Sequence, residues 1–350
     1  MSELTLKNLK SLNSNEKVSM YGAGAMGKFL LKRLKEDRPE IFVECFIDDI
    51  KTSEIEGIPI KPLSQVSENT LILITTSYWR EVVDKLKTKS FKYFVVDLLS
   101  GKSDKEIISR EINGNEMKFF TPNKYLLQVS QNFETIEDCT FNWINSLKIG
   151  STFYDIGASS GIYAVYAAKA KGCLTVAIEP DAQNFAILEM NHHLNRHSLK
   201  KEFVSLNIGL GNEASLLPLK CQEYLAGAHG KVFDMKNRIQ QNDMIYDHIQ
   251  YVLVDSLDHL INRYDLPMPQ YLKIDVDGGE FEVLKGSEKT LRSSKVQEIM
   301  IETDEINQTR INEKLELFNF HLVEKYIINE IIGGEIQGIH NYLYRKNKLQ

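Results

Sequence analysis

Two stretches in which an apolar strand runs into a glycine turn and then a helix restrict the fold more than any other feature. In the first, KVSMYGAGAMGKFLLKRL, the apolar run Val18–Tyr21 meets three glycines. In the second, STFYDIGASSGIYAVYAAKA, the turn lies between Gly157 and Gly161. Such a unit typically opens a parallel α/β sheet, and strands and helices alternate after both turns. The sequence therefore predicts an α/β protein with two Rossmann-like domains.

Chain length supports two domains. At 350 residues the chain exceeds the size at which a single hydrophobic core stops growing. The first alternating array ends near residue 100, and the second begins shortly before the turn at Gly157. We predict a small Rossmann-like domain at 1–100, a linker at 101–118 and a larger domain at 119–350.

Composition excludes several classes of protein. A hydrophobic content of 43%, a net charge of −6 and a pI near 5.8 are typical of a globular protein without the basic surface that binds nucleic acid or anionic membranes. No segment approaches the roughly 18 uninterrupted apolar residues of a membrane span, so a cytoplasmic protein is expected. Four cysteines without a C-x-x-C pair predict free thiols: Cys45, Cys139, Cys173 and Cys221.

The second glycine turn has the form of a site for an adenosine cofactor. A glycine at 157 is expected to leave room for a ligand against the backbone. The next strand, LTVAI, ends at Glu179, whose carboxylate could accept bonds from both ribose hydroxyls. Because the turn does not have the G-x-G-x-x-G spacing of pyrophosphate sites, S-adenosylmethionine is the better prediction than a dinucleotide.

Four motifs in order resemble the FkbM family of S-adenosylmethionine-dependent methyltransferases. They are DIGASSGIYAVYAAKA, AIEPDAQNFAILEMNHHLN, SLNIGLGNEA and YLKIDVDGGEFEVLKG, and the similar region covers about residues 119–345. The chain departs from the family pattern at Ser159, where the family usually has Asn, and at Asp277, where it usually has Glu. Serine in place of asparagine is expected to loosen one hydrogen bond of the turn. Aspartate in place of glutamate shortens the side chain but keeps the carboxylate.

This resemblance implies a class I methyltransferase sheet that transfers a methyl group to an oxygen, typically a hydroxyl of a sugar or natural product. A sugar or glycan precursor, free or nucleotide-linked, is therefore the expected partner. The resemblance places the cofactor on these residues: Asp155, Gly157, Ala158, Ser159, Gly161, Glu179, Pro180, Asn207 and Ile208.

Methyl transfer to a hydroxyl needs an oriented acceptor and a group that takes its proton. Asp275 ends an apolar strand where ligands of open α/β sheets bind, so we predict that it orients or deprotonates the acceptor. His229, in AGAHG, is the rival base. It lies in the polar stretch 220–250, whose lack of periodicity predicts a long loop or lid. Asp275, Asp277 and Glu280 could instead cap the following helix. No metal is predicted, and the weaker alternative is a divalent cation on Asp275, Asp277 and Glu302, with Asp304 nearby.

The first glycine turn is a second nucleotide-site candidate. Gly22, Gly24 and Gly27 have dinucleotide spacing, and Asp48 ends the next strand. With FIDD and GIPI following, the domain resembles the small nucleotide-binding domain at the front of sugar-modifying enzymes. It could hold the nucleotide of a nucleotide-linked sugar, or serve as a scaffold or dimerisation module.

Two other functions stay open at this stage. One is an NAD-dependent oxidoreductase or epimerase, which the lack of a nearby Tyr-x-x-x-Lys pair disfavours. The other is a catalytically silent nucleotide-binding protein that has kept the fold.

Overall fold

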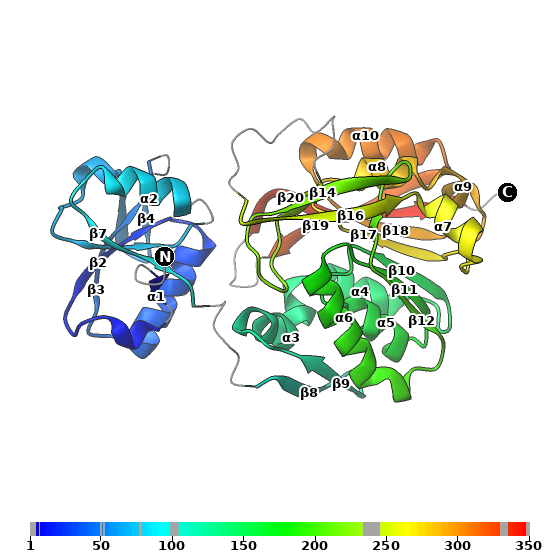
Figure 1. The fold of residues 1–350 in the computed structure, drawn as a ribbon, viewed down its shortest axis with the longest axis horizontal. Helices are drawn as coiled ribbons and strands as arrows, with labels where there is room; N and C mark the ends of the chain where they lie inside the picture. Colours follow the sequence, from blue (N-terminus) through cyan, green and yellow to red (C-terminus); the bar gives the residue numbers. More distant parts are fainter. Residues whose placement is uncertain are drawn as a thin grey trace. The chain divides into compact units, whose positions relative to one another are not determined.

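The computed structural model describes residues 5–6, 8–49, 51, 53–76, 79–98, 105–233, 246–329 and 335–347. The chain divides into two compact units, one of residues 1–102 with 330–334 and one of residues 103–329 with 335–350 (Figure 1). Each unit has its own sheet and core, and the two are described separately. The α/β class predicted from the sequence is confirmed in both.

The larger unit contains a seven-stranded sheet in the order β12-β11-β10-β17-β18-β20-β19. Its strands are β10 (Thr152–Ile156), β11 (Leu174–Ile178), β12 (Phe203–Leu206), β17 (Tyr271–Ile274), β18 (Glu298–Asp304), β19 (Phe320–Asn329) and β20 (Glu335–Lys346). The pairs from β12 to β18 are parallel, whereas β20 is antiparallel to both of its neighbours. The chain moves outward from β10 to β12 and then returns to β17 on the other side of β10. Such a reversal leaves a crevice at the carboxyl ends of β10 and β17.

Helices cover both faces of this sheet (Figure 1). One face packs against α3 (Lys124–Ile136), α4 (Asp138–Ser146), α5 (Ile162–Ala170) and α6 (Ala182–Asn195). The other packs against α7 (Leu257–Tyr264), α8 (Glu280–Lys285), α9 (Glu288–Arg292) and α10 (Glu305–Glu316). Alternate residues of β10 show the pattern, because Phe153 joins the first cluster while Tyr154 and Ile156 join the second. Both faces are apolar, as expected for a parallel sheet.

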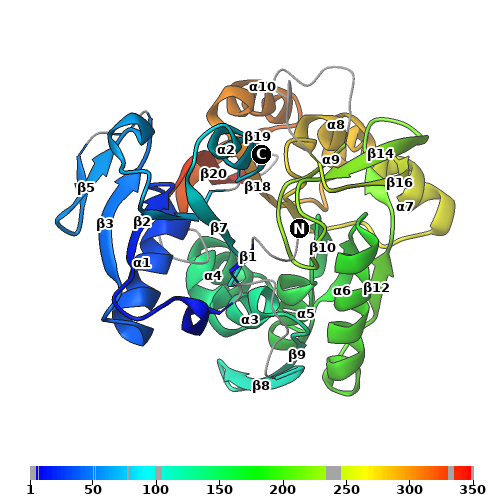
Figure 2. The same ribbon diagram turned by 60° about the vertical axis from the view of Figure 1, so that its left-hand side comes forward.

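A β-hairpin occupies part of the segment expected to be a linker. β8 (Ile107–Ile112) and β9 (Asn115–Phe120) pair antiparallel around Asn113 and Gly114, both at positive φ. An Asn-Gly pair is the usual signal of a tight hairpin turn, so the sequence did contain the information. The hairpin belongs to the larger unit and lies against α6 (Figure 2). Residues 101–104 lie outside the described residues.

A second, four-stranded sheet is inserted between β12 and β17. Its order is β13-β16-β14-β15, formed by β13 (Gly209–Leu210), β14 (Ser215–Cys221), β15 (Lys231–Phe233) and β16 (His248–Asp255). The sequence predicted a long loop over 220–250, but β15 lies within that range and residues 234–245 are outside the described part. At the C-terminal end, β19 and β20 pair antiparallel.

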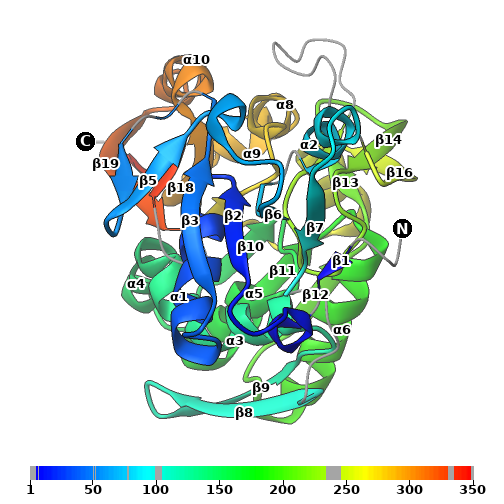
Figure 3. The ribbon, with the colours of Figure 1, turned by 90° about the vertical axis from the view of Figure 1, so that its left-hand side faces the viewer.

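The smaller unit is a second parallel sheet, in the order β1-β7-β6-β2-β3-β5-β4 (Figure 3). Its elements are β1 (Thr5–Leu6), β2 (Lys17–Tyr21), β3 (Phe42–Ile47), β4 (Glu54–Ile55), β5 (Ile58–Lys61), β6 (Leu71–Ile74), β7 (Lys92–Val96), α1 (Ala25–Asp37) and α2 (Trp79–Lys87). Among the strands described in this unit, only the β4–β5 pair is antiparallel. The glycine turn after β2 leads into α1, as the sequence predicted.

All four cysteines are buried free thiols. Within the described ranges, no helix is both long enough and apolar enough to cross a membrane.

Position 157 requires glycine, but for a different reason from the one that the sequence suggested. Its φ is +79°, and a Cβ at this position would lie 1.6 Å from the carbonyl oxygen of Asp275. The space that the sequence assigned to a ligand is therefore occupied by backbone at the end of β17. A side chain at 157 would separate β10 from β17 before it could touch any cofactor.

We predict that Gly157→Ala lowers the free energy of unfolding by more than about 3 kcal/mol, because it adds a backbone clash to an unfavourable φ. Gly114→Ala is the matched control, with φ +74° and no atom within 4 Å of the added Cβ. It should cost only about 1–2 kcal/mol. Urea denaturation of both variants measures the difference, and equal losses would contradict the clash.

Candidate functional site

The glycine turn after β10 is fastened to the neighbouring strand. The amide groups of Gly157 and Ala158 both donate to the carbonyl oxygen of Ile178, at 2.9 and 3.0 Å. Ser159 lies at φ +48°, and Gly161 at φ +74° is the N-cap residue of α5. A Cβ on Gly161 would lie 2.7 Å from the side chain of Leu188, so this glycine allows α6 to approach the turn. The turn is held in one conformation by its own backbone.

Two asparagines on α6 hold the turn and the β8–β9 hairpin together. Asn191 donates to the carbonyl oxygen of Ser160 at 2.8 Å and accepts from the amide of Phe120 at 2.7 Å. Asn195 accepts from the amide of Lys118 and donates to its carbonyl oxygen, at 3.1 and 2.7 Å. Both asparagines are almost fully buried. Their spacing of four residues places them on one helix face, where they pair with the exposed edge of β9.

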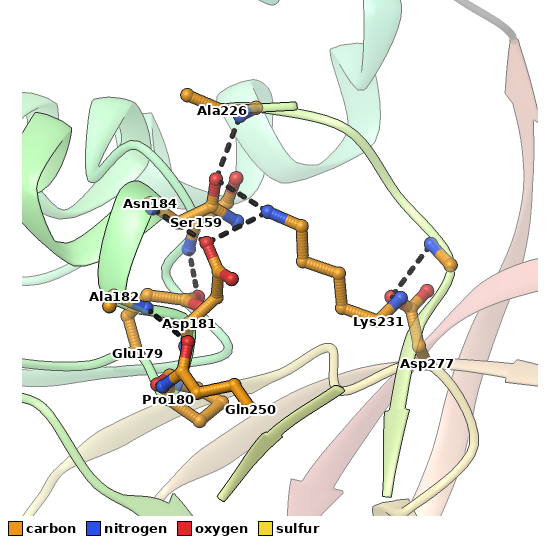
Figure 4. Close-up of polar contacts among 12 residues, drawn as sticks. Ser159, Glu179, Pro180, Asp181, Ala182, Asn184, Ala226, Lys231, Gln250 and Asp277 are labelled. Atoms are coloured by element: carbon orange, nitrogen blue, oxygen red, sulfur yellow. Dashed lines mark hydrogen bonds and ion pairs between the residues drawn. The ribbon is translucent and has the colours of Figure 1, made fainter. Parts of the chain in front are cut away.

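Glu179 lies at the end of β11 and points at the turn (Figure 4). Its Oε2 accepts from the amide of Ser159 at 2.7 Å, and its Oε1 accepts from the amide of Asp181 at 2.8 Å. Burial raises the pKa of Glu179 from 4.5 to about 8, against the opposing effect of these two bonds. A carboxylate has further lone pairs, so the group can still accept bonds from a diol.

Pro180, Asn207 and Ile208 were also predicted to bind the cofactor, and two of them lie at the strand end that carries Glu179. The side chain of Asn207 donates to the carbonyl oxygens of Glu179 and Pro180, at 2.8 and 3.1 Å. Gln250 also donates to Pro180, at 3.0 Å, and accepts from the amide of Ala182 (Figure 4). Ile208 is half-buried against the core under α7 and α8. The geometry shows Asn207 shaping the strand end that carries Glu179.

The segment around His229 is tied down at several points (Figure 4). The amide of Gly227 donates to Oδ1 of Asn184 at 2.7 Å, and the buried ammonium of Lys231 contacts Asp181 and Asn184 at 2.8 and 3.1 Å. The carboxylate of Asp277 accepts from the amides of Gly230 and Lys231, each at 3.1 Å. The segment predicted to be a loop is therefore anchored to α6 and to the end of β17.

His229 itself is exposed on this anchored segment. Its ring lies 6.1 Å from that of Tyr125 in an edge-to-face arrangement. Burial raises the pKa of the Glu137 carboxyl and His229 opposes that effect, so His229 lies within electrostatic range of the carboxylates described next.

Carboxylates gather at the carboxyl ends of the central strands. Asp155 on β10 lies opposite Lys273 on β17, with 4.0 Å between Oδ1 and Nζ. Lys273 donates to Asp275 at 2.7 Å. Carboxylate oxygens of Asp275, Glu302 on β18 and Glu137 between α3 and α4 lie within 4.8 Å of one another. The sequence singled out Asp275 and Glu302 but not Glu137, which is brought here by tertiary packing alone.

The electrostatics of this group follow from crowding and burial. Burial raises the pKa of Asp155 to about 6, and it also raises the pKa values of Glu137 and Glu302. For Lys273, burial alone would lower the pKa, but the carboxylates of Asp275, Glu137 and Asp155 outweigh it and hold the pKa above its ordinary range. The ammonium group of Lys273 is therefore charged, and it is the cation that these carboxyl groups share.

Three other acidic candidates have local structural partners. Glu280 is buried in the first turn of α8 and accepts from the amide of Gly278 at 2.6 Å, with a pKa that burial raises to about 7. Asp304 is the N-cap of α10 and accepts from the amide of Asn307 at 2.7 Å. Asp277 bonds the segment at residues 230–231 and is not one of the three clustered carboxylates. The third carboxylate beside Asp275 and Glu302 is therefore Glu137, whereas the sequence suggested Asp277.

In the smaller unit, the turn at Gly22, Gly24 and Gly27 has the tight geometry expected of its spacing. A Cβ on Gly27 would lie 2.2 Å from the carbonyl oxygen of Gly22. Asp48 accepts from the amide of Lys51 at 2.9 Å. The neighbouring Asp49 contacts Lys85 and accepts from Tyr21 at 3.3 Å. A nucleotide site at this turn stays a prediction.

Comparison with known proteins identifies the class to which the larger unit belongs. The family described as "Methyltransferase FkbM domain" matches residues 155–344, which is more than half of the chain. The chain therefore belongs to the FkbM family of methyltransferases, and the resemblance seen in the four sequence motifs is confirmed. No curated protein sequence matches the chain.

Solved structures with a similar fold are distant. Precorrin-6y C5,15-methyltransferase from Geobacter metallireducens has 12% identity and a TM-score of 0.37, with 61% of this chain and 90% of that chain covered. Sp1610 of Streptococcus pneumoniae in complex with S-adenosyl-L-methionine has 13% identity and a TM-score of 0.36, covering 62% and 76%. TrmK of M. capricolum with S-adenosyl-homocysteine has 11% and 0.34, covering 60% and 68%. With TM-scores this low, the assignment depends on the family match.

The raised pKa of Glu179 predicts a pH-dependent cost in the ligand-free protein. In the folded state this carboxyl keeps its proton up to about pH 8, whereas in the unfolded chain it loses the proton near pH 4.5. Stability is therefore lost as pH rises between these values. Glu179→Gln removes the cost, so between pH 5 and 8 the variant should gain about 1–3 kcal/mol relative to the wild type.

Urea denaturation at several pH values measures this gain. Glu202→Gln, an exposed substitution on the neighbouring loop, should show no such trend. A constant difference between wild type and Glu179→Gln from pH 5 to 8 would show that Glu179 is already ionised in the folded protein.

Proposed function

We propose that the protein transfers the methyl group of S-adenosylmethionine to a hydroxyl oxygen of a sugar or glycan precursor, either free or nucleotide-linked. The observation that carries the proposal is the row of carboxylates at the ends of β17 and β18 beside the glycine turn. Hydroxyl groups of a polyol donate to carboxylates, whereas an apolar acceptor would find no complementary surface there. Family membership supports the methyl transfer, and the acidic row supports the hydroxyl acceptor.

The cofactor would lie across the crevice between β10 and β17. Its ribose hydroxyls would donate to Glu179, and the adenosine would rest against the turn of Ala158, Ser159 and Gly161. Asp155 is 1% exposed, and neither of its carboxylate oxygens has a hydrogen-bond partner. A buried carboxylate in that state is costly, and the ammonium group of the methionine part would satisfy it.

The chemistry needs little beyond positioning, because a sulfonium methyl is already electrophilic. The acceptor O–H bond breaks and its proton passes to a base. The O–CH₃ bond forms as the CH₃–S bond breaks, and S-adenosylhomocysteine leaves. Asp275 is held by Lys273 at 2.7 Å, which suits it to orient the acceptor, while His229 is the second group available to take the proton.

The first test is methyl transfer itself. The full-length protein is incubated with S-adenosylmethionine labelled on the methyl group and with sugars, nucleotide-linked sugars, amines and thiols. The label should appear on a sugar oxygen, assigned by NMR of the product. Transfer only to nitrogen or sulfur would overturn the hydroxyl acceptor, and failure to bind S-adenosylmethionine by calorimetry would overturn the proposal as a whole.

We predict that Glu179→Ala weakens binding of S-adenosylmethionine by about 1–3 kcal/mol, the usual cost of leaving hydrogen-bonding groups unpaired. Isothermal titration measures the affinity directly. Because the glutamate also fastens the turn through Ser159, circular dichroism must first show a folded variant. An unchanged affinity would place the adenosine elsewhere.

We also predict that Asp275→Asn reduces turnover by about 10²–10⁴-fold while the melting temperature and cofactor affinity are preserved. Asp304→Asn is the control, since Asp304 caps α10 and an asparagine caps a helix equally well. Its turnover per folded molecule should match the wild type. Normal turnover in Asp275→Asn together with an inactive His229→Ala would move the essential group to the anchored segment.

A further inference from the structure

Three carboxylates from distant parts of the larger unit converge on one point. Glu137 comes from the junction of α3 and α4, Asp275 from the end of β17 and Glu302 from β18. Each offers an oxygen, and these oxygens lie within 4.8 Å of one another. All three side chains are half-buried.

The sheet register adds an unpartnered amide to this group. Asn341 on β20 lies directly opposite Glu302, and side chains of opposed residues share one face of a sheet. Asn341 is 1% exposed, and neither its Oδ1 nor its Nδ2 has a hydrogen-bond partner. Buried amides are almost always bonded in native proteins. A buried amide without a partner, on the same sheet face as one of the three carboxylates, therefore indicates a missing ligand.

Glu137 shows the same deficit. Its Oε2 is inaccessible to solvent and has no hydrogen-bond partner. The helix junction that carries Glu137 packs onto the sheet through Trp143, whose indole donates to Glu298 at 2.8 Å. Its position above the strand ends is therefore fixed by packing.

Charge in this region is not balanced by the protein. Asp155, Asp275, Glu137 and Glu302 act on one another, and the ammonium of Lys273 can neutralise one of them. Lys273 lies closest to Asp275, at 2.7 Å from Oδ2, and it also attracts Glu137 and Glu302, so one ammonium group is shared among four carboxylates. Buried like charges repel strongly unless a cation or protons compensate them.

We propose that Glu137, Asp275 and Glu302 bind a divalent cation such as Mg²⁺ or Mn²⁺, with the Oδ1 of Asn341 beside them. Carboxylate and amide oxygens are the ligands that these hard cations prefer. Three carboxylates leave coordination positions for water or for acceptor oxygens. If the proposed methyl transfer holds, the cation would bind the acceptor hydroxyl and make it more acidic, so Asp275 would orient the acceptor through the metal.

The test uses the full-length protein after EDTA treatment, with Mn²⁺ as the probe and without S-adenosylmethionine or acceptor. Isothermal titration should show one Mn²⁺ site per chain, and Glu137→Gln and Glu302→Gln should each weaken it by at least about tenfold. Glu313→Gln, an exposed carboxylate on α10, is the matched control and should bind as the wild type does. No binding by the wild type, or equal binding by all four proteins, overturns the proposal.

Melting temperatures give a second readout that separates a cation from protons. Mn²⁺ should raise the Tm of the wild type by several degrees and leave those of Glu137→Gln and Glu302→Gln unchanged. Without metal, both variants should melt above the wild type, because each removes one repelling charge. If the variants melt higher but Mn²⁺ has no effect on the wild type, the carboxyl groups are compensated by protons and the metal site is wrong.

These measurements are independent of the methyl transfer. Failure of Mn²⁺ binding in a protein that methylates a sugar hydroxyl overturns the cation site and leaves the proposed function standing. Mn²⁺ bound at Glu137 and Glu302 in a protein that methylates no hydroxyl supports the cation site and overturns the proposed function.

Discussion

The close approach of two backbones at the reversal point of the larger sheet is the constraint on which the rest of the structure depends. Gly157 follows β10 with so little room that a Cβ would overlap the carbonyl oxygen of Asp275. The same contact brings the turn that ends β10 and the carboxylate that ends β17 to one crevice. Cofactor and acceptor candidates are therefore adjacent because the two strands can touch, and only glycine allows that contact.

Around this contact, polar side chains hold the turns and loops whose backbone groups are not bonded within helices or sheets. Asn191 bonds the glycine turn to the β8–β9 hairpin, and Asp277 bonds the end of β17 to the segment that carries His229. Lys231 continues the same tie to the first turn of α6 through Asp181 and Asn184. Asn191 and Asp277 satisfy backbone amides or carbonyls that would otherwise lose their partners on burial, and Lys231 bonds two buried side chains. The crevice thus has walls of fixed position, which methyl transfer needs for in-line geometry.

The carboxylates at the ends of the central strands differ from these fastened side chains. Their negative charges lie close together, and most of them have no cationic partner of their own. Lys273 is held charged between Asp155 and Asp275, while Glu137 and Asn341 keep buried oxygens with no hydrogen-bond partner. Such an arrangement lowers stability in the ligand-free protein, and proteins retain costly polar groups mainly where a ligand completes them. The contrast with Asp304 and Glu280, which bond neighbouring backbone amides, separates carboxylates that hold the fold from those available for chemistry.

The sequence by itself determined the α/β class, the two glycine turns, the strand-end positions of Glu179 and Asp275, and the FkbM family, because these features are written in local order: apolar runs, glycines and the residue that follows a strand. It also contained the Asn-Gly signal of the β8–β9 hairpin, although the linker prediction passed over it. Only the tertiary structure decided that Gly157 faces backbone, that Asp277 binds a neighbouring segment, and that Glu137 and Asn341 join Glu302. Glu302 lies 165 positions after Glu137 and 39 positions before Asn341. No local sequence pattern predicts contacts over such separations, because they depend on how helices and antiparallel strands pack onto the sheet.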